Sequence, residues 1–187
     1  MRASLKTRLD RKFPVTPFST DYRKQQHFRG ESQALQWRYT EQAMDILQGW
    51  LAIARKGDSS PDAESRLRAV ESTMGFRFPD PVRFLLTTAD RPEGFVGESY
   101  IAFFAVDDLA QCLADVQRAA PGFIPFASNG GGEWYGVDSR LNTPAFVLLP
   151  AIGAEWSAAM FLGSGWEEFW KTLQRGDLFE RSYQVTS

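Results

Sequence analysis

The sequence has very few of the two side chains on which many hydrolases, redox proteins and zinc proteins depend. Its 187 residues include one cysteine, Cys112, and one histidine, His27. A single cysteine cannot form an internal disulfide, so the fold needs no oxidising compartment. Zinc sites need several Cys or His ligands, and a Ser-His-Asp triad or a Cys-His dyad needs a histidine beside its nucleophile. We therefore expect no catalytic residues, no metal and no cofactor.

Long hydrophobic runs are also missing. No apolar stretch approaches the roughly 18 residues of a membrane span, and residues 1–13 lack the apolar centre of a secretory signal. Hydrophobic residues still make up 43% of the chain and aromatic residues 14%, which is enough for the core of one domain. The sequence therefore predicts a cytoplasmic protein that makes no membrane contact.

The net charge of −2 conceals a separation of charge. Residues 1–29 carry eight Lys and Arg against two Asp, so this arm has a net charge of +6 and the rest of the chain −8. Aromatic residues lie among the basic ones, as in segments that stack on nucleic-acid bases. The acidic body and a pI near 5.5 disfavour a nucleic-acid partner. An arm that folds over its own body or over another subunit is the simpler interpretation.

The chain divides into three segments by pattern. Residues 1–30 form the basic arm, residues 31–60 an additional helix and a joint, and residues 61–187 the main domain with a short C-terminal tail. In the joint, Ser60 suits a helix N-cap and Pro61 the first helical position. Gly75 is placed to end that helix in the left-handed conformation, with Phe76 folding back against it.

The remaining elements follow in a mixed order. Helical spacing marks residues 32–55, 63–74, 82–87 and 107–116, and a capping box at Ser164–Glu167 opens a last helix. Strand patterns mark residues 100–105, 123–127, 133–138, 145–149 and 156–162, of which the last two are apolar enough to be central. These patterns predict an α+β fold: a predominantly antiparallel sheet, with parallel pairs left open, and helices at its flanks.

Three features have a simpler explanation than a binding or catalytic site. The run Asn129–Gly132 could hold a phosphate through its backbone N–H groups, but no Lys-Ser or Lys-Thr and no helix follow it, so a hairpin loop is favoured. Glu133 and Asp138 could be paired carboxylates, but strand alternation directs them to opposite faces, and a catalytic pair must converge. Cys112 lies on an apolar helix face and is expected to be a small core residue.

Several landmarks, in order, resemble the SUKH superfamily, which includes fungal Smi/Knr cell-wall regulators and many bacterial immunity proteins. They are Glu64–Leu67, Met74–Pro79 with Arg83, Leu85 and Leu86, then Phe104–Leu109, Gly122–Asp138 and Ser164–Phe169. The resemblance covers roughly residues 61 to 175, whereas residues 1–60 match no family. It implies a SUKH-like α+β fold without a shared active site.

The resemblance also implies protein binding. Bacterial members of the superfamily are often antitoxins of polymorphic or contact-dependent toxins, and fungal members act as scaffolds. The leading hypothesis is an immunity protein that covers the active site of a toxin domain, such as a basic nuclease or deaminase. The alternative is an intracellular scaffold or regulatory adaptor without a toxin. A hydrolase that uses carboxylates alone ranks third.

Acidic residues beside aromatic ones mark the predicted partner-binding surface. Aromatic side chains anchor many interfaces, and charged neighbours steer the approach of a partner. On this basis the candidate partner-binding residues are Glu133, Trp134, Tyr135, Asp138, Glu155 and Trp156.

Overall fold

The computed structural model describes residues 41–140, 145–176 and 178. Within them, the helices are α2 (Glu41–Ile53), α3 (Ala63–Met74), α4 (Asp80–Thr88), α5 (Leu109–Val116) and α6 (Trp166–Arg175). The strands are β1 (Arg55–Asp58), β2 (Ala89–Val96), β3 (Ser99–Phe103), β4 (Phe123–Ser128), β5 (Glu133–Asp138), β6 (Ala145–Pro150) and β7 (Met160–Gly163). The basic arm and the predicted start of the first helix lie outside the described residues.

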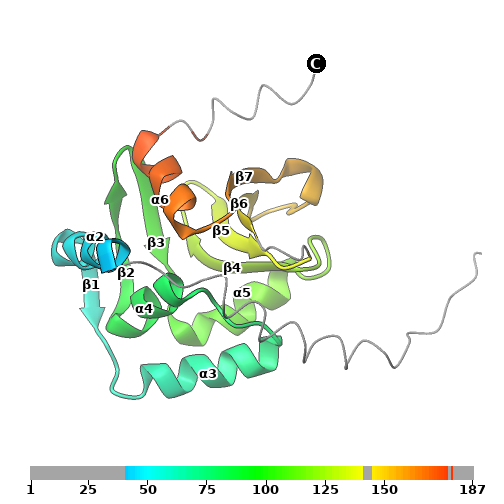
Figure 1. Ribbon diagram of the computed structural model, residues 1–187. Helices are drawn as coiled ribbons and strands as arrows, with labels where there is room; N and C mark the ends of the chain where they lie inside the picture. The colour runs from blue at the N-terminus through cyan, green and yellow to red at the C-terminus, as the bar shows by residue number, and fades with distance from the viewer. Residues whose placement is uncertain (1–40, 141–144, 177, 179–187) are drawn as a thin grey trace, which may run out of the picture.

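The seven strands form one open sheet in which each strand pairs with the next along the chain. Every described pairing is antiparallel, so the α+β prediction is confirmed and the parallel pairs left open are absent from the described sheet. Helices α3, α4 and α5 gather at one end of this sheet, and α6 lies toward the other end (Figure 1). None of the described helices is long and apolar enough to cross a membrane.

The predicted β4–β5 hairpin is confirmed. Gly130 and Gly132 have φ angles of 73° and 106°, a region in which side chains other than glycine are strained. Asn129 closes the loop, because its Oδ1 accepts bonds from the backbone N–H groups of Gly131 (2.8 Å) and Glu133 (3.0 Å). The Gly-rich run is therefore a hairpin loop held by its own asparagine.

Helix ends were predicted with mixed success. Gly75 does end α3 with a φ of 64°, and the N–H of Phe76 bonds the carbonyl oxygen of Glu71 at 3.2 Å. The Ser60 cap is wrong, since α3 begins at Ala63 and the Ser60 hydroxyl bonds the carboxylate of Asp62 instead of a backbone N–H. The last helix begins one residue later than the predicted box implies, at Trp166 with Gly165 as its N-cap. The acidic partner of Ser164 is Glu168, whose carboxylate accepts from the N–H and hydroxyl of Ser164.

Strands at the two sheet edges differ from the prediction. The pattern shows neither β1 nor β2, because β1 is exposed along its length and β2 carries Pro92 and Gly94. The segment 156–162 is not one central strand. It forms a short 3-10 helix, η2 (Trp156–Ala158), and then β7, which is an edge strand with Phe161 half exposed. Strand β6 is buried on both faces, as predicted.

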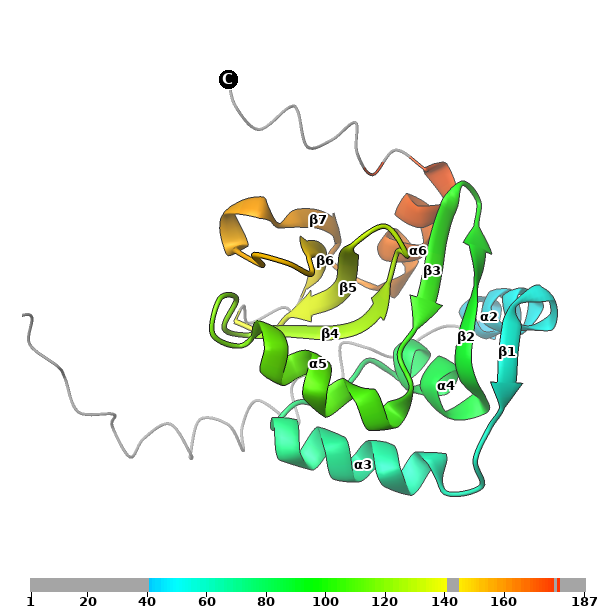
Figure 2. The same ribbon diagram turned by 180° about the vertical axis from the view of Figure 1, so that it is seen from behind.

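The main core surrounds the inner side of α6. Phe169 stacks on Phe146 of β6, with ring centroids 4.8 Å apart, and Trp170 meets Trp50 of α2 edge-on at 5.7 Å. A second, smaller core covers the other face of β4 to β6 and includes Phe123, Val147, Leu149, Val116 and Ala154. Figure 2 shows α5 lying against β4, near this second core. The central strands are therefore buried between two apolar layers.

Candidate binding surface

Strand β5 separates its predicted contact residues onto two faces. Tyr135 faces the main core, where its ring meets Phe169 edge-on at 5.8 Å and its hydroxyl donates to the carbonyl oxygen of Tyr100 at 3.2 Å. It is fully buried, and this burial raises its pKa. The proposal of Tyr135 as a partner contact is therefore corrected: its apolar ring stabilises the core and no part of it is left for a partner.

Trp134 and Glu133 lie at the hairpin end of β5, and both are half-buried. The Trp134 ring packs edge-on against Phe104 at 5.4 Å. The Glu133 carboxylate accepts a bond of 2.5 Å from the side-chain amide of Asn129, so it also helps to close the hairpin loop. These two residues keep some surface for a partner, but each already has a structural contact.

Asp138 and Trp156 meet at the opposite end of β5 through a residue that the sequence analysis did not select, Arg140. Asp138 accepts three bonds from Arg140: from the backbone N–H at 3.0 Å, Nε at 2.9 Å and Nη2 at 2.8 Å. These bonds raise the pKa of the guanidinium. The Arg140 Cζ atom lies 3.3 Å from the centre of the Trp156 ring, a cation–π geometry.

Two further contacts fix the Trp156 ring. Its Nε1 donates to the carbonyl oxygen of Pro121 at 3.1 Å, and its ring meets Phe123 edge-on with centroids 6.2 Å apart. We call Phe123, Asp138, Arg140 and Trp156 the Trp156 platform. Asp138 is buried beneath Arg140, so its predicted contact role is corrected to that of a positioning residue. Glu155 is exposed next to the platform, and its carboxylate accepts from the Ser157 hydroxyl at 3.3 Å.

The platform borders a groove of about 1080 Å³. Its walls are α3, the turn after α3, the start of α4, the end of α5 and the two loops that flank the β4–β5 pair. Four arginines from these separate elements line it: Arg68, Arg77, Arg83 and Arg140. We call it the arginine groove.

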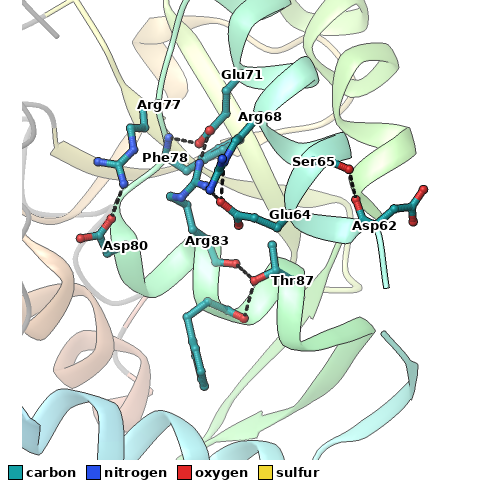
Figure 3. Close-up of polar contacts among 11 residues, drawn as sticks. Asp62, Glu64, Ser65, Arg68, Glu71, Arg77, Phe78, Asp80, Arg83 and Thr87 are labelled. Carbon is teal, nitrogen blue, oxygen red and sulfur yellow. Dashed lines mark hydrogen bonds and ion pairs between the residues drawn. The ribbon is translucent and has the colours of Figure 1, made fainter. Parts of the chain in front are cut away.

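A buried ion pair joins the two helices beside the groove (Figure 3). Arg83 of α4 donates to the Glu71 carboxylate, whose other oxygen accepts the backbone N–H of Phe78 at 2.8 Å. Arg83 also reaches Glu64 at 2.5 Å, and Arg68 bonds the same Glu64 oxygen at 2.8 Å. Burial opposes both charges, but these partners outweigh it: the pKa of Arg83 is raised and that of Glu64 is lowered.

Sequence reasoning selected none of Glu71, Arg83 and Arg140 as a site residue, and it named Arg83 only as a landmark of the family resemblance. A signal existed for two of them. Glu71 lies four residues after Leu67, on the apolar stripe of α3, and Arg83 lies among the buried residues of α4. Charged residues on an apolar face are normally paired, so the two helices were candidates for a mutual ion pair. Arg140 follows the end of β5 and gave no such signal.

Metal-ligating groups do not gather on the described part of the chain: no three His, Cys, Asp or Glu side chains are placed to hold an ion there. Cys112 is partly buried, and this burial raises the pKa of its thiol to about 11. Asp108 and Asp115 add to the rise by their negative charge.

The antiparallel sheet with its flanking helices, over the segment that carries the SUKH landmarks, defines an α+β domain of the SUKH type. A comparison with family models agrees: the SMI1 / KNR4 family (SUKH-1) matches residues 63–173, which is more than half of the chain. The chain belongs to this family. No curated protein matches it.

Proposed function

We propose that this domain is a protein-binding module and that it serves as an immunity protein, which neutralises a polymorphic or contact-dependent toxin in the cytoplasm by covering its active site. Family membership supports the proposal, because the SUKH superfamily includes many bacterial immunity proteins. The toxin domain would be a basic protein such as a nuclease or deaminase, since the body that follows the arm carries a net charge of −8.

The Trp156 platform is the observation that carries the proposal. Trp and Arg are the residues most often found at energetic centres of protein interfaces. Here the two side chains are stacked, partly exposed and already held by Asp138 and Pro121. Because these two side chains are already held in place, they lose little conformational freedom when a partner binds, and this favours affinity. Exposed Glu155 beside the ring is placed to steer a basic partner.

A growth assay tests the immunity role. The C-terminal domain of a secreted protein encoded beside this gene would be expressed alone and together with this chain. We expect the domain to stop growth and the chain to restore it. Trp156→Ala should weaken binding of that domain by about 30-fold, as a central anchor does. Phe95→Ala, which removes an exposed aromatic from β2, is the matched control and should bind like the wild type.

The outcomes separate the two candidate functions. If the chain neither restores growth nor binds the neighbouring domain, the immunity role is rejected. A neighbouring gene unrelated to secretion, together with a non-toxic partner that depends on Trp156, supports the scaffold or adaptor instead. Equal binding by Trp156→Ala and the wild type rejects the platform as the contact surface.

A further inference from the structure

Three of the four arginines that line the arginine groove are more exposed than the carboxylates that they bond. In the pair of Arg140 with Asp138, the arginine side chain is 45% exposed and the carboxylate side chain 7%. Arg77 and Arg68, at 55% and 72%, are likewise more exposed than the carboxylates that they bond, at 34% and 46%. At these three pairs the guanidinium N–H groups are therefore more accessible to a molecule in the groove than the carboxylate oxygens. Arg83 is the exception, since it is 10% exposed and its partner Glu64 46%.

The remaining carboxylate of the groove, Glu71, adds little negative charge to its surface. It is buried and bonded to Arg83 and to the Phe78 N–H. Glu64 is more exposed, but one of its oxygens already bonds two guanidiniums, those of Arg68 and Arg83. Each guanidinium has five N–H donors, and its carboxylate partner uses only some of them. The remaining N–H groups are available to a ligand in the groove.

Apolar side chains also line the groove. They are Met74, Phe76, Leu113 and Ile124. A ligand that fits both features carries carboxylates together with apolar side chains. An acidic protein segment with interspersed apolar residues has this composition.

We propose that the arginine groove binds an acidic segment of the partner protein, through the guanidinium groups of Arg68, Arg77 and Arg140. This inference rests on the proposed protein-binding function and adds the chemistry of the bound segment. It also fits a toxin that acts on nucleic acid: such a partner has a basic surface around catalytic carboxylates, so an acidic body and an arginine-lined groove are both complementary to it.

A peptide titration tests the groove directly. Short fluorescein-labelled peptides that alternate Glu with Leu, Gln with Leu, and Lys with Leu would be titrated with the full chain by fluorescence anisotropy. We expect the Glu peptide to bind at least about tenfold more tightly than the other two, and added salt to reduce this preference. Equal affinity for the three peptides, or a preference for the Lys peptide, overturns the proposal.

Charge-matched variants locate the binding site. The double variant Arg68→Gln with Arg77→Gln should bind the Glu peptide about threefold to tenfold more weakly, since each exposed ion pair contributes modestly. The control pair, Arg55→Gln with Lys171→Gln, removes the same charge from β1 and α6 and should bind like the wild type. If both double variants lose the same affinity for the Glu peptide, the effect is one of general charge, and the proposal that the groove is the binding site is overturned.

Failure of this inference is distinguishable from failure of the proposed function. If the Glu peptide does not bind the groove while Trp156→Ala still weakens binding of the toxin domain, the groove proposal fails and the protein-binding proposal stands. If the chain binds no neighbouring protein, the immunity role fails whatever the peptides do. Thermal unfolding of each variant identifies any loss that is due to unfolding.

Discussion

The buried pair of Glu71 and Arg83 gives the sharpest prediction about stability. Glu71→Met leaves the Phe78 N–H unbonded and Arg83 with Glu64 as its only carboxylate partner among those described. Arg83→Met leaves a buried carboxylate with one backbone donor. Removing one partner of a buried pair costs about 3 kcal/mol or more. We therefore expect each single variant to lower the free energy of unfolding by that amount.

The double variant, Glu71→Met with Arg83→Met, should lower the free energy of unfolding by less than either single variant does. With both charges replaced by methionine, no buried charge is left, and the loss is mainly that of the bond to the Phe78 N–H, about 1–3 kcal/mol. The summed losses of the two single variants then exceed the loss of the double variant, and the difference, the coupling energy, is at least about 3 kcal/mol.

Urea unfolding followed by tryptophan fluorescence measures these energies, because Trp50, Trp166 and Trp170 are buried in the main core. Arg77→Gln is the matched control. It breaks the exposed 2.9 Å pair with Asp80 and should cost less than about 1 kcal/mol. A double variant that costs the sum of the two single variants would show that Glu71 and Arg83 act independently, and would refute the reasoning.

Two further predictions concern titratable groups. The Cys112 thiol, with its pKa raised to about 11, should react with iodoacetamide at pH 8 at least about 100-fold more slowly in the folded protein than in urea; equal rates would contradict its burial. The lowered pKa of Glu64 means that the unfolded chain binds its proton at a higher pH than the folded chain. Stability should therefore fall with pH below about 4.5, and Glu64→Gln should flatten this fall in melting temperatures measured across that range; identical profiles would argue against the ion pairs of Glu64.

Local patterns predicted the parts of the fold that short-range chemistry decides. Gly75 adopts the left-handed conformation in which a glycine stop is expected, and Asn129 with its glycines closes the predicted hairpin. Strand β6 is apolar at nearly every position and is buried between the two cores. In each case the residues that decide the conformation are neighbours in the sequence, so the pattern contains the physical cause.

Long-range contacts decide the parts that the patterns missed. Strand β2 carries Pro92 and Gly94, both poor strand residues, yet it pairs with β1 and β3 on its two sides. The polar segment of β1 is an edge strand with no apolar alternation to reveal it. These strands exist because partners distant in sequence bond their backbones, and no local window contains those partners.

The candidate surface shows the same division between local and long-range causes. Alternation correctly places Trp134 and Asp138 on one face of β5, but four residues of strand separate them by about 13 Å. One small contact cannot include both. Asp138 instead contacts Trp156 through Arg140. This happens because the chain after β6 passes over the second core and places the Trp156 ring against Phe123, at the start of β4. A partner centred on Trp156 therefore meets Arg140 and the arginine groove, and it reaches Trp134 only if its interface also extends along β5.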